Sequence, residues 1–404
     1  MNYTGKISQA SQRMKSSLIR ELVSSTKNIP GLISFAGGFP SPATFPKDIL
    51  GRLFRDVVEQ EGADVLQYGA SEGDPILKSE LIKWEGYDLS PDELLTTIGA
   101  TNALYCYGRA LVDPGDVVLC EAPTFIGSLV QFDALGAELN SVPMDEEGID
   151  LDRLESVIRS LQAGKKKIKF LYTIPDFQNP SGITMSHQRR RDLISLCLRH
   201  EIPLLEDNPY SRLRYSGETV PTLYQVAKED FSGSDIVTEV VSFSKILGPG
   251  MRMAFVKGNK DLIAKMCSWQ QKVNITPDCV AQRVVARFIQ QGHLEPHLAS
   301  IRQFYTPYLD KMLRDLQTYM PDSVAWTKPQ GGIFLWITLP AGINAEQLFH
   351  LAAANKVAFI PGSKFYPEGQ EQRNTLRLNF SYSTLDQIDE GVKRLAQLLK
   401  AINA

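Results

Sequence analysis

The residue best suited to chemistry in this sequence is Lys245. It follows an apolar, strand-like run from Ile236 to Val241, and two serines, Ser242 and Ser244, stand between this run and the lysine. A lysine amine can form a Schiff base with a carbonyl group. The two hydroxyl groups and Arg252, beyond a glycine-rich turn, suit a phosphate. A carbonyl and a phosphate on one small molecule describe pyridoxal 5′-phosphate (PLP); the alternative is a surface lysine beside a turn.

A carboxylate and a phenol follow another short apolar run. Ile202 to Leu205 reads as a buried strand, and Asp207 and Tyr210 come after it. Open α/β sheets bind ligands beyond the carboxyl ends of their strands. A carboxylate there can keep the PLP pyridine nitrogen protonated, so that the ring accepts electrons. Tyr210 can donate a hydrogen bond to the phenolic oxygen of the ring, whereas a helix cap is the alternative role for Asp207.

Asn179 occupies a similar position after a third run, Phe170 to Pro175. Because Asn179 precedes a proline, its backbone is biased toward extended geometry, which leaves its amide free to reach a ligand. Alone, Asn179 would be a turn residue. The order of these residues, each behind an expected strand, indicates a shared site.

With these motifs in hand, the chain resembles fold-type I PLP-dependent aminotransferases of class I and II. The similarity extends from about Ile19 to Phe380 and implies that the protein is an enzyme that transfers amino groups with PLP. The matching segments are Asn179-Pro180-Ser181-Gly182, Asp207-Asn208-Pro209-Tyr210, Ser242-Phe243-Ser244-Lys245 and Leu376-Arg377-Leu378-Asn379-Phe380.

Arg377 lies in an alternating, strand-like segment. An arginine that points inward there is costly unless it is paired. The α-carboxylate of an amino acid is a natural bidentate partner, and an internal salt bridge is the alternative.

A phosphate cradle is expected where the run Thr96 to Ile98 passes through Gly99 into a helix. Free N–H groups at a helix N-terminus bind phosphates, although an ordinary strand-to-helix turn has the same pattern. The resemblance assigns the phosphate to Ala100, Thr101 and Asn102, and Ser242, Ser244 and Arg252 would complete its binding shell.

Four further assignments come from the resemblance alone. Phe125 matches the aromatic residue that stacks on the pyridine ring, and Tyr68 matches a tyrosine that reaches the phosphate of the neighbouring subunit, which implies a homodimer. The segments around Gly38 and Arg20 resemble the branch of 2-aminoadipate aminotransferases and kynurenine aminotransferase II. There Gly38 would lie against the substrate, and Arg20 would meet its distal end. The alternatives are a core phenylalanine, a surface turn and a solvated arginine.

The elements that must position these residues alternate along the chain. Expected strands and intervening helices predict an α/β fold with a mostly parallel, doubly wound sheet. The strands are 94–98, 117–120, 167–174, 202–205 and 236–243, and the helices include 101–111, 150–161 and 186–200.

Beyond about residue 295 the pattern changes to a long helix (298–319), two strand-like runs (332–339 and 357–360) and a final amphipathic helix. This predicts a smaller α+β domain. The resemblance adds the N-terminal segment to it, so we expect a large PLP-binding domain at 46–295 and a small domain formed by 1–45 and 296–404.

Composition limits the remaining function classes. The chain has 404 residues, 43% hydrophobic residues and a net charge of −3. These values favour no nucleic-acid partner, and no apolar run reaches the length of a membrane span. Five scattered cysteines fit reduced thiols and a cytoplasmic location. His293 and His297 are spaced as zinc ligands, but Pro296 between them favours a loop before a helix, so we expect no metal.

Transamination is the expected reaction, with amino acid and 2-oxo acid substrates. The amino donor would be of the 2-aminoadipate, aromatic or branched-chain type, and the acceptor 2-oxoglutarate. Lys245 would move the α-proton, and ping-pong kinetics would follow. Three alternatives are a PLP-dependent lyase or decarboxylase, an inactive relative, and an aminotransferase-like regulator. The last requires a DNA-binding domain, for which the residues before Gly37 are too few.

Overall fold

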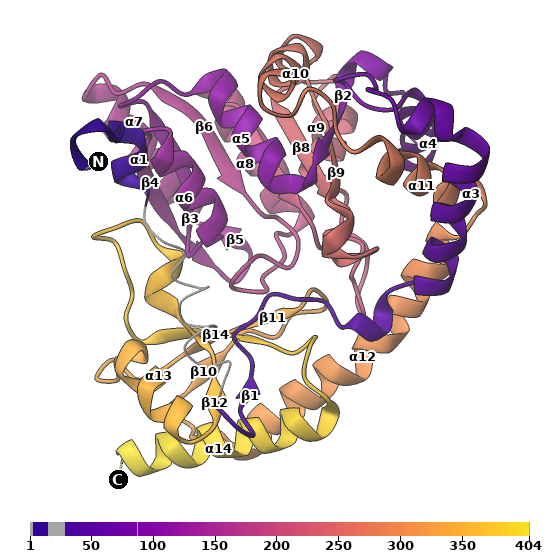
Figure 1. Ribbon diagram of the computed structural model, residues 1–404. Coiled ribbons are helices and arrows are strands. Elements are labelled where there is room, and N and C mark those ends of the chain that lie inside the picture. Colours follow the sequence, from indigo (N-terminus) through magenta and orange to yellow (C-terminus); the bar gives the residue numbers. More distant parts are fainter. Residues whose placement is uncertain (1–2, 15–28, 87, 404) are drawn as a thin grey trace.

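The computed structural model describes residues 3–14, 29–86 and 88–403 (Figure 1). Its upper part in Figure 1 contains an eight-stranded sheet with the strand order β2-β9-β8-β7-β6-β3-β4-β5. Five strands from β8 to β4 are parallel, whereas β9 is antiparallel to both of its neighbours. The strands are β2 (Leu94–Ile98), β3 (Val117–Ala122), β4 (Glu138–Asp145), β5 (Gly148–Ile149), β6 (Ile168–Thr173), β7 (Leu204–Asn208), β8 (Val237–Ser242) and β9 (Met253–Lys257).

Helices cover both faces of this sheet. One group of contacting helices includes α5, α6 and α10, a second includes α7, α8 and α9, and both α5 and α9 pack on β8. The helices of this part are α3 (Lys47–Val65), α4 (Pro75–Glu85), α5 (Gly99–Leu111), α6 (Ile126–Ala134), α7 (Leu151–Ala163), α8 (His187–Arg199), α9 (Leu223–Asp230), α10 (Lys260–Asn274) and α11 (Cys279–Gln290). The short α1 (Gln9–Arg13) lies beside α6. The predicted doubly wound α/β fold is confirmed.

A smaller α+β part lies below the large sheet in Figure 1. Its antiparallel sheet has the order β10-β11-β14-β13, and a separate parallel pair joins β1 to β12. The elements are β1 (Ile33–Ser34), β10 (Ala325–Trp326), β11 (Phe334–Thr338), β12 (Val357–Ala358), β13 (Ile360–Pro361), β14 (Thr375–Asn379), α13 (Ala345–Ala354) and α14 (Leu385–Asn403). The predicted strand at 357–360 is therefore two short strands in different sheets.

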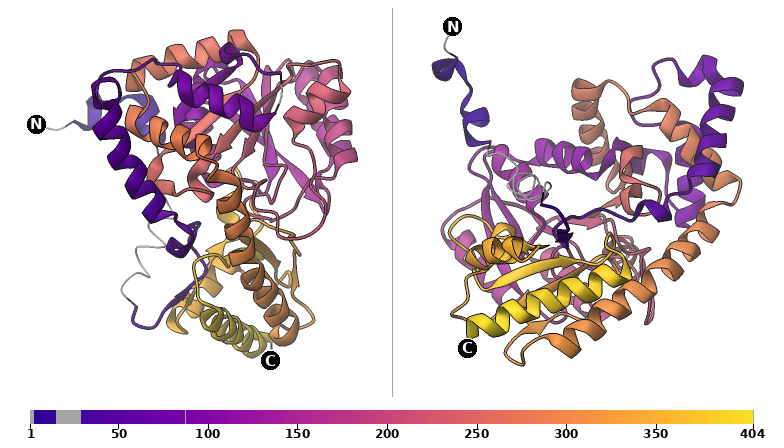
Figure 2. Two further views of the ribbon diagram at one scale, coloured as in Figure 1. Left: turned by 90° about the vertical axis from the view of Figure 1, so that its right-hand side faces the viewer. Right: turned by 60° about the horizontal axis from the view of Figure 1, so that its bottom comes forward.

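One long helix, α12 (Leu294–Tyr319), connects the two parts, as both views of Figure 2 show. Leu298 and Tyr305 belong to the hydrophobic core of the large part, and Leu309 and Leu316 belong to that of the small part. Pro307 lies inside the helix between the two sets.

Several predicted boundaries were wrong, three of them close to residues discussed above. The strand expected to end at Leu205 continues to Asn208 because β7 pairs with β8 as far as Asn208, so Asp207 lies within the strand. The helix expected from Thr101 begins at Gly99. α12 begins at Leu294 and includes His297, which donates its Nε2 to the carbonyl oxygen of Ile246 at 2.6 Å; a proline in the first helical turn removes no intrahelical hydrogen bond.

Candidate active site

Lys245 ends a short 3-10 helix (Phe243–Lys245) that directly follows β8. Its amine donates a hydrogen bond to the carbonyl oxygen of Gly38 at 2.7 Å, which joins the large part to the N-terminal segment. Burial lowers the pKa of Lys245 to about 8, and the positive charges of Arg377 and Arg252 act in the same direction. A buried lysine with a lowered pKa has a substantial neutral fraction near pH 8, and only a neutral amine can act as a nucleophile or base.

Asp207, buried near the end of β7, has one oxygen engaged and one free. Tyr172 on the neighbouring strand β6 donates its hydroxyl to Oδ2 at 2.7 Å. Among the described residues, Oδ1 has no hydrogen-bond partner. Burial raises the pKa of Asp207 to about 6, while the Tyr172 hydrogen bond opposes this change. Tyr172 was not predicted as a site residue, although a buried tyrosine hydroxyl in an apolar strand requires a partner.

Arg377 on β14 is buried beside Asn179. It donates Nη1 to Oδ1 of Asn179 and Nη2 to the carbonyl oxygen of Ala36, both at 2.9 Å. Its Nε has no hydrogen-bond partner in the described part of the chain. The guanidinium lies over the rings of Phe334 and Phe365, at 4.0 and 5.0 Å from their centroids. Burial lowers its pKa to about 10, so the arginine keeps its positive charge at neutral pH in an apolar surrounding that favours an anion.

Tyr210 and Gly38 lie next to this group. Burial raises the pKa of Tyr210, which Arg377 and Asn179 partly oppose, so its hydroxyl keeps its proton at neutral pH. A Cβ atom at Gly38 would lie 3.3 Å from Cζ of Phe334. The absence of a side chain at Gly38 therefore leaves space beside Phe334 and the Lys245 amine.

The segment expected to cradle a phosphate is the N-terminus of α5. Gly99 has a φ of +72°, and a Cβ atom there would lie 2.5 Å from Nη2 of Arg252, so the guanidinium closes over the first turn. Asn102 accepts a hydrogen bond from the backbone N–H of Ile98 at 3.4 Å. Thr101 is exposed, and with Ala100 it presents first-turn N–H groups that have no intrahelical partner. The combination of these N–H groups with a guanidinium binds anions.

The two serines before Lys245 are joined by a hydrogen bond and differ in burial. The backbone N–H of Ser244 donates to Oγ of Ser242 at 3.2 Å, which stabilises the turn that carries the lysine. Ser242 is buried, and Ser244 is half-buried.

A second carboxylate that the sequence did not reveal stabilises two loops of the site. Glu121 accepts a hydrogen bond at 3.0 Å from Gln178, and Gln178 also donates to the carbonyl oxygen of Pro123 at 2.7 Å. These contacts link the segment before Phe125 to the segment before Asn179. Burial raises the pKa of Glu121 to about 7. Phe125, half-buried, is the N-cap of α6.

One predicted residue, Tyr68, is not part of this group, and another, Arg20, cannot be placed. Tyr68 is 75% exposed, so within one chain it lies outside the buried site. Arg20 lies outside the described residues. In the part of the chain that the structure describes, no group of three or more His, Cys, Asp or Glu residues could hold a metal ion. None of the described helices is both long and apolar enough to cross a membrane.

The arrangement fits PLP. The free oxygen of Asp207 suits a protonated pyridine nitrogen, the cradle at α5 suits a phosphate, and the Lys245 amine suits an aldehyde. Asp207 lies on β7, and Lys245 follows the adjacent strand β8. The cradle at α5 follows β2, which only β9 separates from β8.

Comparison with known proteins gives the same result. The family model described as aminotransferase class I and II matches residues 45–395. The aromatic-amino-acid aminotransferase 1 of Thermococcus litoralis is 39% identical, with 99% of this chain and 95% of that protein covered. A kynurenine aminotransferase of Pyrococcus horikoshii, solved in complex with PMP, is 37% identical, with a TM-score of 0.93 and 98% of both chains covered.

An α-aminoadipate aminotransferase of Thermus thermophilus, solved in complex with N-(5′-phosphopyridoxyl)-L-leucine, is 33% identical with a TM-score of 0.91, and the match covers 100% of this chain and 99% of that one. These relatives are named for amino-group transfer, which favours that reaction over the lyase and decarboxylase alternatives. The chain therefore belongs to the class I and II aminotransferases, enzymes of fold type I that depend on PLP.

Proposed function

We propose that this aminotransferase moves the amino group of an L-amino acid of the 2-aminoadipate, aromatic or branched-chain type to 2-oxoglutarate. The observation that carries the proposal is the pair of Lys245 and Arg377, an amine of lowered pKa near a buried arginine whose Nε has no hydrogen-bond partner among the described residues. An amino acid substrate needs both groups, one for its α-proton and one for its α-carboxylate. The names of the three relatives support the choice of donors.

Lys245 would hold the cofactor and then act on the substrate as general base and acid. When bound, PLP supplies an aldehyde for the lysine and a pyridine ring that accepts the electron pair of the substrate α-carbon. The amine is tethered after β8 and hydrogen-bonded to Gly38. A group with a pKa of about 8 is suited both to take and to return a proton near neutral pH.

Asp207, Asn179 and Tyr210 would hold the ring. Oδ1 of Asp207 would accept the N–H of the pyridine, while Tyr172 keeps the carboxylate in position. The amide of Asn179 and the hydroxyl of Tyr210 would donate to the phenolic oxygen of the ring. Phe125 would stack on the ring face.

Arg377 and Gly38 would orient the substrate, and Asn179 would contribute to the same subsite through its hydrogen bond with Arg377. The α-carboxylate can accept two hydrogen bonds from Arg377, one from Nε and one from an adjacent N–H. These two bonds would hold the substrate in a fixed orientation. Arg20 would meet the distal end of a long substrate.

The cofactor phosphate would be bound by the first turn of α5 and the segment around Lys245. The residues are Ala100, Thr101, Asn102, Ser242, Ser244 and Arg252. The dipole of α5 and the charge of Arg252 favour an anion at this position.

A homodimer would complete the phosphate site with Tyr68 of the second subunit. Apolar side chains gather near Tyr68 on the surface, since Leu66 is 70% and Ile275 54% exposed. Ser71 donates its hydroxyl to the carbonyl oxygen of Ile275 at 2.7 Å, which brings the two segments together. An exposed apolar patch of this kind favours association with another protein surface.

The domain limits proposed for the chain are 46–295 for the large domain and 1–45 with 296–404 for the small one. The two hydrophobic cores support this division, because Ile33 and Phe35 join the core of the C-terminal part. We also place the protein in the cytoplasm, as five unpaired cysteines suggest.

A panel of amino donors with 2-oxoglutarate as acceptor tests the function. It should include 2-aminoadipate, kynurenine, leucine and the aromatic amino acids, with glutamate formation as the readout. The proposal predicts glutamate formation and parallel lines in double-reciprocal plots, whereas release of CO₂ without glutamate would contradict it. Lys245→Ala should abolish turnover, and borohydride treatment of the holoenzyme should label only the peptide that contains Lys245.

A further inference from the structure

A cavity lies apart from the residues of the Lys245 site. It has a volume of about 280 Å³ and is lined by α4, α9, α12, the loop 211–222 and Asp176. Within the described chain, none of the residues assigned above to the cofactor or the substrate lines it. The polar side chains that matter for its chemistry are Asp176, Arg212, Arg214 and Arg302.

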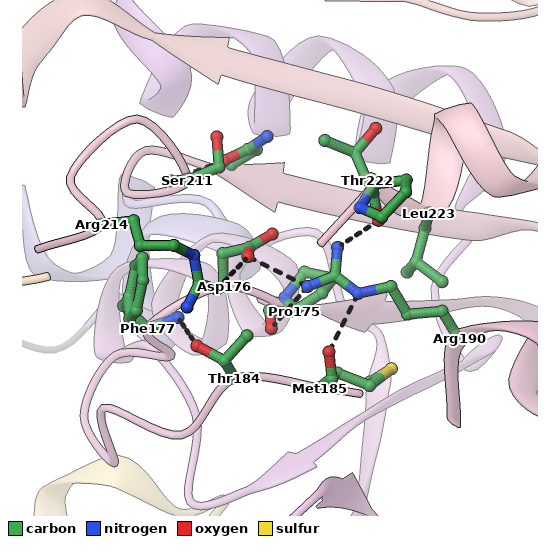
Figure 3. A network of polar contacts seen from close by, with 12 residues as sticks. Pro175, Asp176, Phe177, Thr184, Met185, Arg190, Ser211, Arg214, Thr222 and Leu223 are labelled. Carbon is green, nitrogen blue, oxygen red and sulfur yellow. Dashed lines mark hydrogen bonds and ion pairs between the residues drawn. The ribbon is translucent and has the colours of Figure 1, made fainter. Parts of the chain in front are cut away.

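Asp176 presents an unpaired oxygen in this region. Arg190, fully buried, contacts Oδ1 of Asp176 through Nη2 at 3.0 Å. It also donates to the carbonyl oxygens of Met185, Pro175 and Pro221 (Figure 3). Oδ2 of Asp176 has no hydrogen-bond partner among the described residues, although the side chain is only 3% exposed. Figure 3 shows this oxygen turned away from Arg190, on the side where Ser211 and Thr222 lie.

Arg214 supplies a complementary donor that lacks a hydrogen-bond partner. Its Nη1 donates to Oε1 of Gln330 at 2.9 Å, and its guanidinium lies 4.7 Å from the ring centroid of Phe177. Its Nη2 forms a long ion pair with Oδ1 of Asp176 at 3.9 Å but has no hydrogen-bond partner in the described structure, and the side chain is 9% exposed. A buried donor and a buried acceptor that are both unsatisfied cost free energy, which a ligand that pairs with both would recover.

The charges of the lining restrict the ligand. Arg302 and Arg212 add positive charge beside Arg214, and Glu85 is already paired with Arg212 at 3.3 Å. An anionic group is therefore favoured near the arginines. Asp176 would repel an anion that has no proton to donate, so the ligand must also carry a cationic or hydrogen-bond-donating group within a few bonds of its anionic group.

We propose that this cavity binds a free α-amino acid as a zwitterion, at a site separate from the active site. The α-ammonium would donate to Oδ2 of Asp176, and the α-carboxylate would accept from Nη2 of Arg214. Both groups are attached to one carbon, which suits two atoms that lack hydrogen-bond partners and belong to neighbouring side chains. The cavity is slightly smaller than the range typical of drug-sized ligands, as expected for so small a molecule.

Calorimetric titration of the holoenzyme, after borohydride has fixed the cofactor on the protein, tests the proposal. The probes are the twenty standard L-amino acids, titrated singly. At least one of them should bind saturably, at one site per subunit. The Arg377→Gln variant should bind the same amino acid with an affinity within about twofold of the wild-type value. Its N-acetyl and carboxamide derivatives, which lack one charge each, should bind at least about tenfold more weakly.

Two variants assign the binding to the cavity. Arg214→Gln removes the free donor, and Val220→Trp fills the space without removing a charged group; each should weaken binding at least about tenfold. Thermal unfolding and the cofactor absorbance show whether each variant keeps the fold. If Arg214→Gln does not fold, the binding measured with Val220→Trp tests the proposal. Absence of saturable binding up to about 20 mM would overturn the proposal. So would binding that is lost in Arg377→Gln but kept in Val220→Trp, because the amino acid would then occupy the active site.

Discussion

The hydroxyl of Tyr172 donates to Oδ2 of Asp207 at 2.7 Å across two adjacent parallel strands, β6 and β7. This contact fixes the plane of the carboxylate and leaves Oδ1 free of partners among the described residues. Because the strands are fully buried here, the carboxylate has little freedom to rotate. Asp207 is thus oriented before any ligand binds.

Removing the negative charge of Asp207 should slow catalysis more than removing the Tyr172 hydroxyl that orients it. Asp207→Asn keeps the size of the side chain but removes the negative charge, so kcat should fall about 10- to 150-fold, equivalent to about 1.5–3 kcal/mol. Tyr172→Phe should lower kcat only about 2- to 10-fold. It should also move the acidic limb of the pH profile to higher pH, because loss of the hydrogen bond raises the pKa of Asp207. Equal rates for wild type and Asp207→Asn would exclude the proposed role.

The lowered pKa of Lys245 predicts a pH-dependent stability of the cofactor-free enzyme. The folded state binds fewer protons than the unfolded state between pH 8 and the ordinary lysine pKa of 10.5, so the contribution of Lys245 to the free energy of unfolding rises with pH in that window. Below pH 8 the amine is charged in the folded state too, so its destabilising contribution to the free energy of unfolding is at its maximum. Lys245→Met should therefore be more stable than wild type at pH 7, and its advantage should shrink above pH 8. Denaturant unfolding at several pH values measures the difference, and a difference independent of pH would contradict the assignment.

Arg377→Lys keeps a positive charge but loses the planar pair of donors. We expect kcat/KM for amino donors to fall about 10- to 100-fold, mainly through KM, because a lysine cannot bind the carboxylate in a bidentate manner. Affinity for PLP, followed by absorbance titration, should change little. If PLP binding fell as much as kcat/KM, Arg377 would be supporting the cofactor instead of the substrate.

The role of Tyr68 can be tested by mixing subunits. Tyr68→Ala and Lys245→Ala should each be nearly inactive alone. In a heterodimer of the two, one site combines the intact Lys245 of one chain with the intact Tyr68 of the other, so activity should return. Equal mixing gives about half heterodimers with one good site each, or about a quarter of wild-type activity. If mixing restores nothing although dimers exchange, Tyr68 does not serve the other subunit.

The sequence predicted that residues at or just beyond the carboxyl ends of neighbouring strands lie close together. Lys245, Asp207, Asn179 and the first turn of α5 all lie at the carboxyl ends of mutually parallel strands, where local patterns of strand and turn are sufficient to bring them together. Boundaries were less accurate, as at Asp207, because pairing with β8 extends β7 beyond its apolar run.

Residues that act through long-range contacts were missed. Phe334 and Phe365 lie over Arg377, and Glu121 contacts Gln178, yet each would be an ordinary core or loop residue in its own segment. The cavity near Asp176 was likewise not predictable, since Arg190, Arg214 and Arg302 come from three distant parts of the chain. Such groups become recognisable only when the tertiary fold places them together.

The course of α12 has a mechanical consequence. Since Pro307 cannot donate a backbone hydrogen bond, the helix is weakest there, between the residues anchored in one core and those anchored in the other. Any tilt of the smaller lobe should therefore concentrate in that short stretch. The amino-terminal turns, including the contact of His297 with Ile246, would stay in place. Lys245 would then remain stationary while the wall that carries Arg377 opens and closes around an incoming molecule.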